Sequence, residues 1–146
     1  MARFLTLNVN GLRDPNKRMS FLQWLTRASA DFLCLQETHV TSDCECFFWF
    51  SSLGFSILCS PGSSHSCGTV LLFRHSYSLR RSFTDSAGRF VCGVFDFDGI
   101  SFNVFLFMHQ TAILAALIFF ILFLTKWTRL SQQSFVGPLM LFLTDL

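Results

Sequence analysis

The chain has 146 residues, enough for one small domain, and a formal net charge of +2, which permits a phosphate-bearing partner without requiring one. Its amino terminus shows no cleavable signal sequence, and its six cysteines have no regular spacing. Cys44 and Cys46 are too close together for a zinc knuckle, so the composition argues against a zinc-binding or disulfide-bonded secreted protein. We expect an intracellular protein, nuclear or cytoplasmic, with reduced thiols.

The first predicted strand covers residues 4–7 and runs into two asparagines and a turn glycine. Asn8 and Asn10 are two positions apart, so an extended backbone presents both side chains on the same side.

A helix is predicted next, because Asp14 is a good cap and Pro15 a good first helical residue. Its apolar stripe runs to about Ala28 and includes Trp24, which we expect in the core. This helix is the crossover between two parallel strands.

The second strand, residues 32–35, has the length and composition of a strand buried on both faces. Glu37 follows at its carboxyl edge, where open α/β sheets place their ligands. A lone carboxylate there could also cap the next element or pair with an arginine. With the two strands parallel, Asn8, Asn10 and Glu37 gather at one edge and form a plausible site for Mg²⁺, whose preferred ligands are oxygens.

Two motifs carry a family resemblance. Residues 7–13 read Leu-Asn-Val-Asn-Gly-Leu-Arg, and residues 35–39 read Leu-Gln-Glu-Thr-His. In this order they resemble the amino-terminal half of the endonuclease/exonuclease/phosphatase superfamily, and more narrowly the apurinic-endonuclease-like domain of LINE-type retrotransposons. The resemblance implies a Mg²⁺-dependent phosphodiesterase that nicks DNA. By this resemblance Asn8, Asn10 and Glu37 are catalytic, and Glu37 and Asn10 hold the metal.

Further along, a helix over residues 45–53, strands over 55–59 and 68–73, and a hairpin with strands from 90 and 100 are predicted. Four arginines make residues 74–89 the most basic segment. Arg74 and Arg89 are expected to pair with DNA phosphates, since the turn before residue 90 resembles one that lies near the nucleic-acid backbone in the family. Arg80 and Arg81 are expected to be solvated.

The resemblance breaks near Leu106. The family continues with Tyr-Ala-Pro-Asn, whereas residues 107–111 read Phe-Met-His-Gln-Thr. A reading frame shifted by one base takes the last base of each codon with the first two bases of the next. In that frame, the codons of residues 107–111 permit Tyr-Ala-Pro-Asn. The same operation on residues 135–140 permits Cys-Gly-X-Phe-Asn, close to the family's Gly-Asp-Phe-Asn, although X cannot be aspartate. We therefore predict that residues 107–146 are translated out of frame from a decayed retrotransposon copy.

The tail also has a membrane interpretation. Residues 112–124 are apolar without a break. The alternative is therefore a single membrane-spanning helix over residues 104–125. A full span needs about 20 apolar residues, more than this uninterrupted run provides.

The expected fold is a partial α/β sandwich. Residues 1–106 supply the amino-terminal half of the endonuclease/exonuclease/phosphatase domain, namely one sheet and its crossover helices. Residues 107–146 are expected to form a hydrophobic, helical tail, and the second sheet is either absent or replaced by this helix. Because most catalytic motifs of the family have no counterpart in the chain, we expect negligible nuclease activity. An active phosphoesterase of the same superfamily is the alternative.

Overall fold

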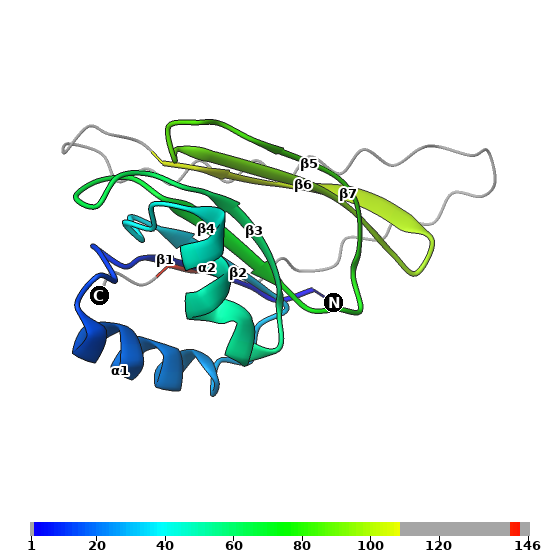
Figure 1. Cartoon of the computed structure of the whole chain (residues 1–146). Helices are drawn as coiled ribbons and strands as arrows, with labels where there is room; N and C mark the ends of the chain where they lie inside the picture. Colours follow the sequence, from blue (N-terminus) through cyan, green and yellow to red (C-terminus); the bar gives the residue numbers. More distant parts are fainter. Residues whose placement is uncertain (1, 109–140, 144–146) are drawn as a thin grey trace.

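The computed structural model describes residues 2–108 and 141–143, and its two β-sheets pack face to face (Figure 1). Helices cover the outer face of the first sheet, so the layers run helix, sheet, sheet. This is the expected α/β sandwich, and the fold class is confirmed.

The first sheet has five strands in the order β3-β4-β2-β1-β8. β1 (Phe4–Asn8) and β2 (Phe32–Gln36) pair in parallel with Phe4 opposite Phe32. The other members are β3 (Ser56–Ser60), β4 (Thr69–Phe73) and β8 (Leu141–Leu143). The parallel pairing brings the carboxyl ends of β1 and β2 to one edge, as predicted.

Helix α1 (Pro15–Leu25) connects the two parallel strands. Asp14 caps it by accepting a hydrogen bond from the Lys17 N–H at 2.8 Å, and Pro15 is its first residue, as predicted. The expected place of Trp24 is wrong: its side chain is 42% exposed. Phe21 and Leu25 fill the core position, and the indole stacks on the outer side of Phe21.

Helix α2 (Asp43–Phe50) and a short 3-10 turn (Ser51–Leu53) form the second helical segment. Ser42 caps α2 by accepting a hydrogen bond from the Glu45 N–H. Gly54 ends the segment in the left-handed conformation that glycine adopts most easily.

Strand β2 lies at the centre of two hydrophobic cores because successive side chains point to opposite faces. Leu33 and Leu35 pack under the helices. Phe32 and Cys34 pack between the two sheets. The prediction that this strand is buried on both faces is confirmed, since every residue of β2 is buried.

The second sheet consists of β5 (Ser78–Thr84), β6 (Phe90–Phe97) and β7 (Ile100–Phe107). We expected residues 1–106 to supply one sheet, so the extent of the sandwich was underestimated. The hairpin of β6 and β7 was predicted, and it packs Phe95 and Phe102 against Phe32 of the first sheet. β5 was missed because all its residues are exposed, which leaves no apolar alternation to detect.

The membrane helix proposed over residues 104–125 is wrong at its start, because residues 104–107 form the end of β7. Among the residues that the structure describes, no helix is long and apolar enough to cross a membrane. The helical tail predicted over residues 107–146 is wrong where the structure describes it, because Phe107 ends β7 and residues 141–143 form β8 beside β1. Residues 109–140 and 144–146 lie outside the described residues.

Candidate active site

The candidate site lies where β1 and β2 end, and the segment after β2 is held there by backbone hydrogen bonds. The Gly11 N–H donates to the carbonyl of Glu37 at 2.6 Å. On the other side, the His39 N–H donates to the carbonyl of Cys67 at 3.0 Å. Glu37 and His39 both adopt positive φ angles, 54° and 59°. The chain therefore leaves the extended conformation at the first residue after β2.

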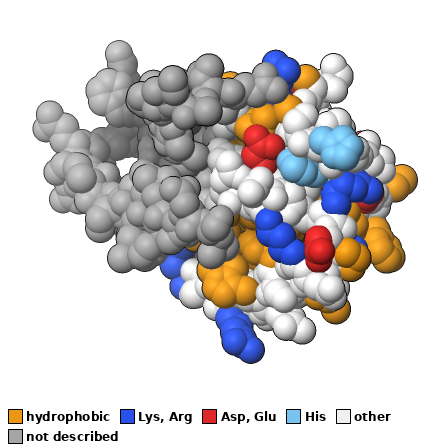
Figure 2. All heavy atoms as spheres, turned by 90° about the vertical axis from the view of Figure 1, so that its left-hand side faces the viewer, with side chains coloured by type: hydrophobic (Ala, Val, Ile, Leu, Met, Phe, Trp, Pro, Cys, Tyr) orange, Lys and Arg blue, Asp and Glu red, His pale blue; other side chains and the backbone are white. Residues whose placement is uncertain are grey.

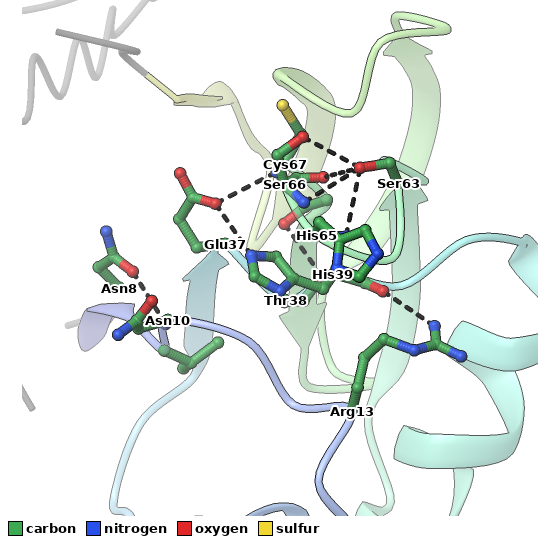
Figure 3. A network of polar contacts seen from close by, with 12 residues as sticks. Asn8, Asn10, Arg13, Glu37, Thr38, His39, Ser63, His65, Ser66 and Cys67 are labelled. Carbon is green, nitrogen blue, oxygen red and sulfur yellow. Dashed lines mark hydrogen bonds and ion pairs between the residues drawn. The ribbon is translucent and has the colours of Figure 1, made fainter.

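The carboxylate of Glu37 is bound through one of its two oxygens. Oε2 accepts a hydrogen bond from the Cys67 N–H at 3.1 Å and lies 3.3 Å from Nε2 of His39 (Figure 3). In the described part of the chain, Oε2 makes both of these contacts, and Oε1 points away from His39. The side chain is 26% exposed, so Oε1 can reach an outside ligand.

Asn8 and Asn10 lie on the β1 side of Glu37 (Figure 3). The Asn10 N–H donates to Oδ1 of Asn8 at 3.0 Å, and both asparagines are exposed. Asn10 has a φ of 45°, so the backbone is not extended at this residue as the sequence prediction assumed. The structure nevertheless brings together the three residues that the sequence predicted as catalytic.

Arg13 links this edge to α2. Its Nη1 donates to the carbonyl of His39 at 3.2 Å and contacts the carboxylate of Glu45 at 3.1 Å. Burial raises the pKa of Glu45, but hydrogen bonds from Thr41 and Arg13 and the charge of Arg13 outweigh it, and the pKa lies below its ordinary value. This carboxylate therefore stays ionised and holds Arg13 in place.

Residues 5–134 match the Endonuclease/Exonuclease/phosphatase family. The chain belongs to this family. A stretch of 38 residues is 45% identical to the exodeoxyribonuclease of Bacillus subtilis (strain 168), and it covers 26% of the chain and 15% of that protein.

Several solved structures share the fold. The AP endonuclease LMAP of Leishmania major is 24% identical with a TM-score of 0.58, over 73% of the chain and 40% of that protein. Truncated Caenorhabditis elegans TDP2 is 19% identical with a TM-score of 0.56, over 76% of the chain and 47% of that protein. At these identities the likeness concerns the fold. The chain spans less than half the length of either protein.

The donor set at Glu37 fits a hard divalent cation, the kind of ion expected in this family, but fits it weakly. Glu37 offers one carboxylate oxygen, and Asn8 and Asn10 offer amide oxygens, with water left to complete the shell. No group of three or more His, Cys, Asp and Glu side chains that could hold a metal occurs among the described residues. A single carboxylate predicts low affinity.

The two arginines expected to bind DNA occupy opposite ends of the first sheet. Arg89 lies at the site end, because its carbonyl accepts the Met108 N–H and the neighbouring Gly88 carbonyl accepts the Gly68 N–H. Arg74 lies at the far end, where its Nε donates to the Ala30 carbonyl and its guanidinium packs over Phe55. The structure thus brings Arg89, but not Arg74, to the end that holds Glu37.

Figure 2 views the molecule from the edge at which β1 ends. Acidic and histidine side chains lie together on this face, and Lys and Arg side chains lie around them. His39 was not among the predicted site residues, although its place two residues after Glu37 was a signal that could have been used.

Proposed function

We propose that the chain is a fragment of a Mg²⁺-dependent endonuclease that hydrolyses DNA phosphodiester bonds, and that on its own it hydrolyses DNA negligibly. The observation that carries this proposal is the isolation of Glu37. In the described part of the chain, no group of three or more His, Cys, Asp and Glu side chains that could hold a metal includes this carboxylate, and Asn8 and Asn10 beside it carry no charge. DNA as substrate is supported by the names of the similar proteins, two of which are an AP endonuclease and an exodeoxyribonuclease.

The residues present account for part of the chemistry. Oε1 of Glu37 would bind Mg²⁺, and bound Mg²⁺ stabilises the charge that develops on a phosphate during hydrolysis. Asn8 and Asn10 would hydrogen-bond the phosphate or the attacking water from the β1 side. Arg89 would pair with a neighbouring phosphate.

Activation of water is the missing step. Hydrolysis requires a group that accepts a proton from the attacking water. Among the described residues of the site, Glu37 cannot both bind the cation and serve as this base, and Asn8 and Asn10 carry neutral amides that do not accept protons near pH 7. His39 contacts Glu37 through Nε2, and its Nδ1 faces Gly11. We therefore expect a bound phosphodiester to remain uncleaved.

A plasmid-nicking assay with the full chain tests this proposal. We expect wild type with Mg²⁺ to nick supercoiled DNA no faster than Glu37→Ala or than wild type with a chelator. A metal-dependent nuclease in the same buffer serves as the positive control. Nicking by wild type that is lost in Glu37→Ala would show an active phosphoesterase, and the proposed inactivity would be wrong.

The retrotransposon origin needs a separate test, because enzyme assays do not address it. We propose that residues from 107 onward are read out of frame from a LINE-type copy. Sequencing the genomic locus and its transcript through codons 100–146, with translation in all three frames, checks this. We expect the frame shifted by one base to continue through Tyr-Ala-Pro-Asn-like and Gly-X-Phe-Asn-like motifs. An uninterrupted genuine frame would contradict the proposal.

A further inference from the structure

We propose that His39 is a positioning residue that turns the Glu37 carboxylate toward the metal, an inference that rests on the proposed function. A carboxylate only accepts hydrogen bonds, so in their 3.3 Å contact Nε2 of His39 is the donor and Oε2 of Glu37 the acceptor. The Cys67 N–H donates to the same oxygen. With two donors on Oε2, Oε1 is the oxygen that faces outward (Figure 3).

The imidazole is held in place from its other side by Gly11. A Cβ atom added at Gly11 would lie 2.7 Å from Nδ1 of His39, closer than such atoms approach, and 3.0 Å from Cε1, a tight contact. Gly11 also has a φ of 80°, a conformation that favours glycine. The turn glycine of the first motif thus makes room for the histidine of the second.

The backbone of His39 is fixed as well. Its N–H donates to the Cys67 carbonyl, and its own carbonyl accepts from Arg13. The side chain is 17% exposed, less than that of Glu37. A donor fixed in this way restricts the rotamers of Glu37 before a metal binds. Metal binding then loses less side-chain entropy at Glu37.

Metal affinity, measured on the full chain by calorimetric titration with Mn²⁺, tests the inference without relying on catalysis. We expect Glu37→Gln to abolish the binding seen in wild type. His39→Ala should weaken it about 10-fold, the lower end of the effect usual for partners of ligating side chains. His39→Gln should restore most of the affinity, because the glutamine amide places an N–H donor near the position of Nε2.

Two further variants separate positioning from general damage. His65→Ala is the matched control, because His65 is exposed in the neighbouring loop and its backbone N–H, which the substitution keeps, donates to Ser63 Oγ. Mn²⁺ affinity should not change. Gly11→Ala should weaken binding in wild type by displacing the imidazole, but not further in His39→Ala. Circular dichroism of each variant verifies that it is folded.

The outcomes distinguish the two proposals. Equal Mn²⁺ affinity of wild type and Glu37→Gln, or no binding in either, would overturn the proposed metal site and with it the role of His39. Binding that requires Glu37 but is the same in His39→Ala and His65→Ala would overturn the role of His39 alone. So would a His39→Gln variant as weak as His39→Ala, because a restored donor would then have no effect.

Discussion

Asp85 organises the turn before β6 through one carboxylate oxygen. Its Oδ1 accepts hydrogen bonds from Ser60 Oγ at 2.7 Å and from the N–H groups of Arg89 and Phe90 at 2.9 Å. Burial raises the pKa of Asp85, but these hydrogen bonds and one from the Ala87 N–H outweigh it, and the pKa lies below its ordinary value. The folded protein therefore favours the ionised form, next to the residue expected to bind phosphate.

This pKa shift predicts a pH-dependent effect of Asp85→Asn. A carboxyl group whose pKa is lowered on folding contributes stability above its unfolded pKa, about 3.9, and that contribution is lost as the pH falls through the folded value. We expect the variant to melt below wild type near pH 7, with a difference that shrinks under acid conditions below about pH 4. Thermal melts monitored by circular dichroism across this range check it. A difference independent of pH would contradict the assignment to charge.

Cysteine reactivity is a second property set at single residues. Burial raises the pKa of Cys34 to about 12, and its thiol lies between the two sheets. Cys44 is exposed on α2. Because the thiolate is the reactive form, we expect iodoacetamide near pH 8 to modify Cys44 in the native protein and to leave Cys34 unmodified until denaturant is added. Mass spectrometry of the digested protein measures both sites in one sample.

Single residues also show where sequence reasoning stopped. The positions of Glu37 and both asparagines at one edge were predicted, because they follow from two parallel strands and a crossover. The partners of Glu37 were not identified, because the positive φ angles of Glu37, His39 and Cys67 break the alternation on which such reasoning depends. Contacts made after a strand ends depend on these turns, which the residue pattern does not reveal.

Among the structural elements, the segment just before β4 supports the site most directly. Gly68 has a φ of 86°, and its carbonyl accepts the Thr38 N–H. A Cβ atom there would lie 2.6 Å from Oγ1 of Thr38 and 3.1 Å from the backbone nitrogen of His39. Any side chain at this position would push on the segment that carries Glu37.

Gly68→Ala and Gly99→Ala form a matched pair. Gly99 has a φ of 76° at the tip of the β6–β7 hairpin, and an added Cβ would meet nothing within 4 Å. We expect Gly99→Ala to cost about 1 kcal/mol of unfolding free energy, the backbone term alone, and Gly68→Ala to cost clearly more and to weaken Mn²⁺ binding. Urea denaturation compares them. Equal losses would show that the contact with Thr38 is unimportant.

The predicted elements succeeded or failed according to the strength of their local signals. β2 was found from its short apolar run, and α1 from Asp14 and Pro15. β5 contains Arg80 and Arg81, and Arg80 pairs with Asp96 of β6. β5 belongs to the sheet because it pairs with β6, and the residues of β5 alone carry no signal of that pairing. It was therefore not predicted.

At the scale of the whole molecule, an aromatic cluster joins the two sheets. The ring of Phe32 stacks on Phe4 at 4.8 Å, meets Phe95 edge-on at 5.1 Å and lies 4.6 Å from Tyr77. Phe32 is fully buried. One side chain of the first sheet thus contacts both layers of the sandwich.

Phe32→Ala tests how far the sandwich depends on this cluster. Removal of a buried phenylalanine typically costs about 3–5 kcal/mol, a large share of the stability of a small domain. We expect the variant to be largely unfolded or to melt far below wild type. Phe83→Ala is the control, because Phe83 is 54% exposed on β5, and its loss should change stability by no more than about 0.5 kcal/mol. Similar melting of the two variants would contradict the prediction.

Tyr77, the only tyrosine of the chain, makes this junction visible to spectroscopy. Burial and the negative charge of Asp31 raise the pKa of its phenol, with Arg3 acting in the opposite direction. Its ring lies 4.6 Å from Phe97 of the second sheet as well as from Phe32 of the first. Alkaline titration of the tyrosine absorbance therefore reports whether the two sheets are packed together. Separation of the sheets would expose the phenol to solvent and lower its pKa toward the ordinary value. The chain carries its own optical probe of sheet separation, with no label added.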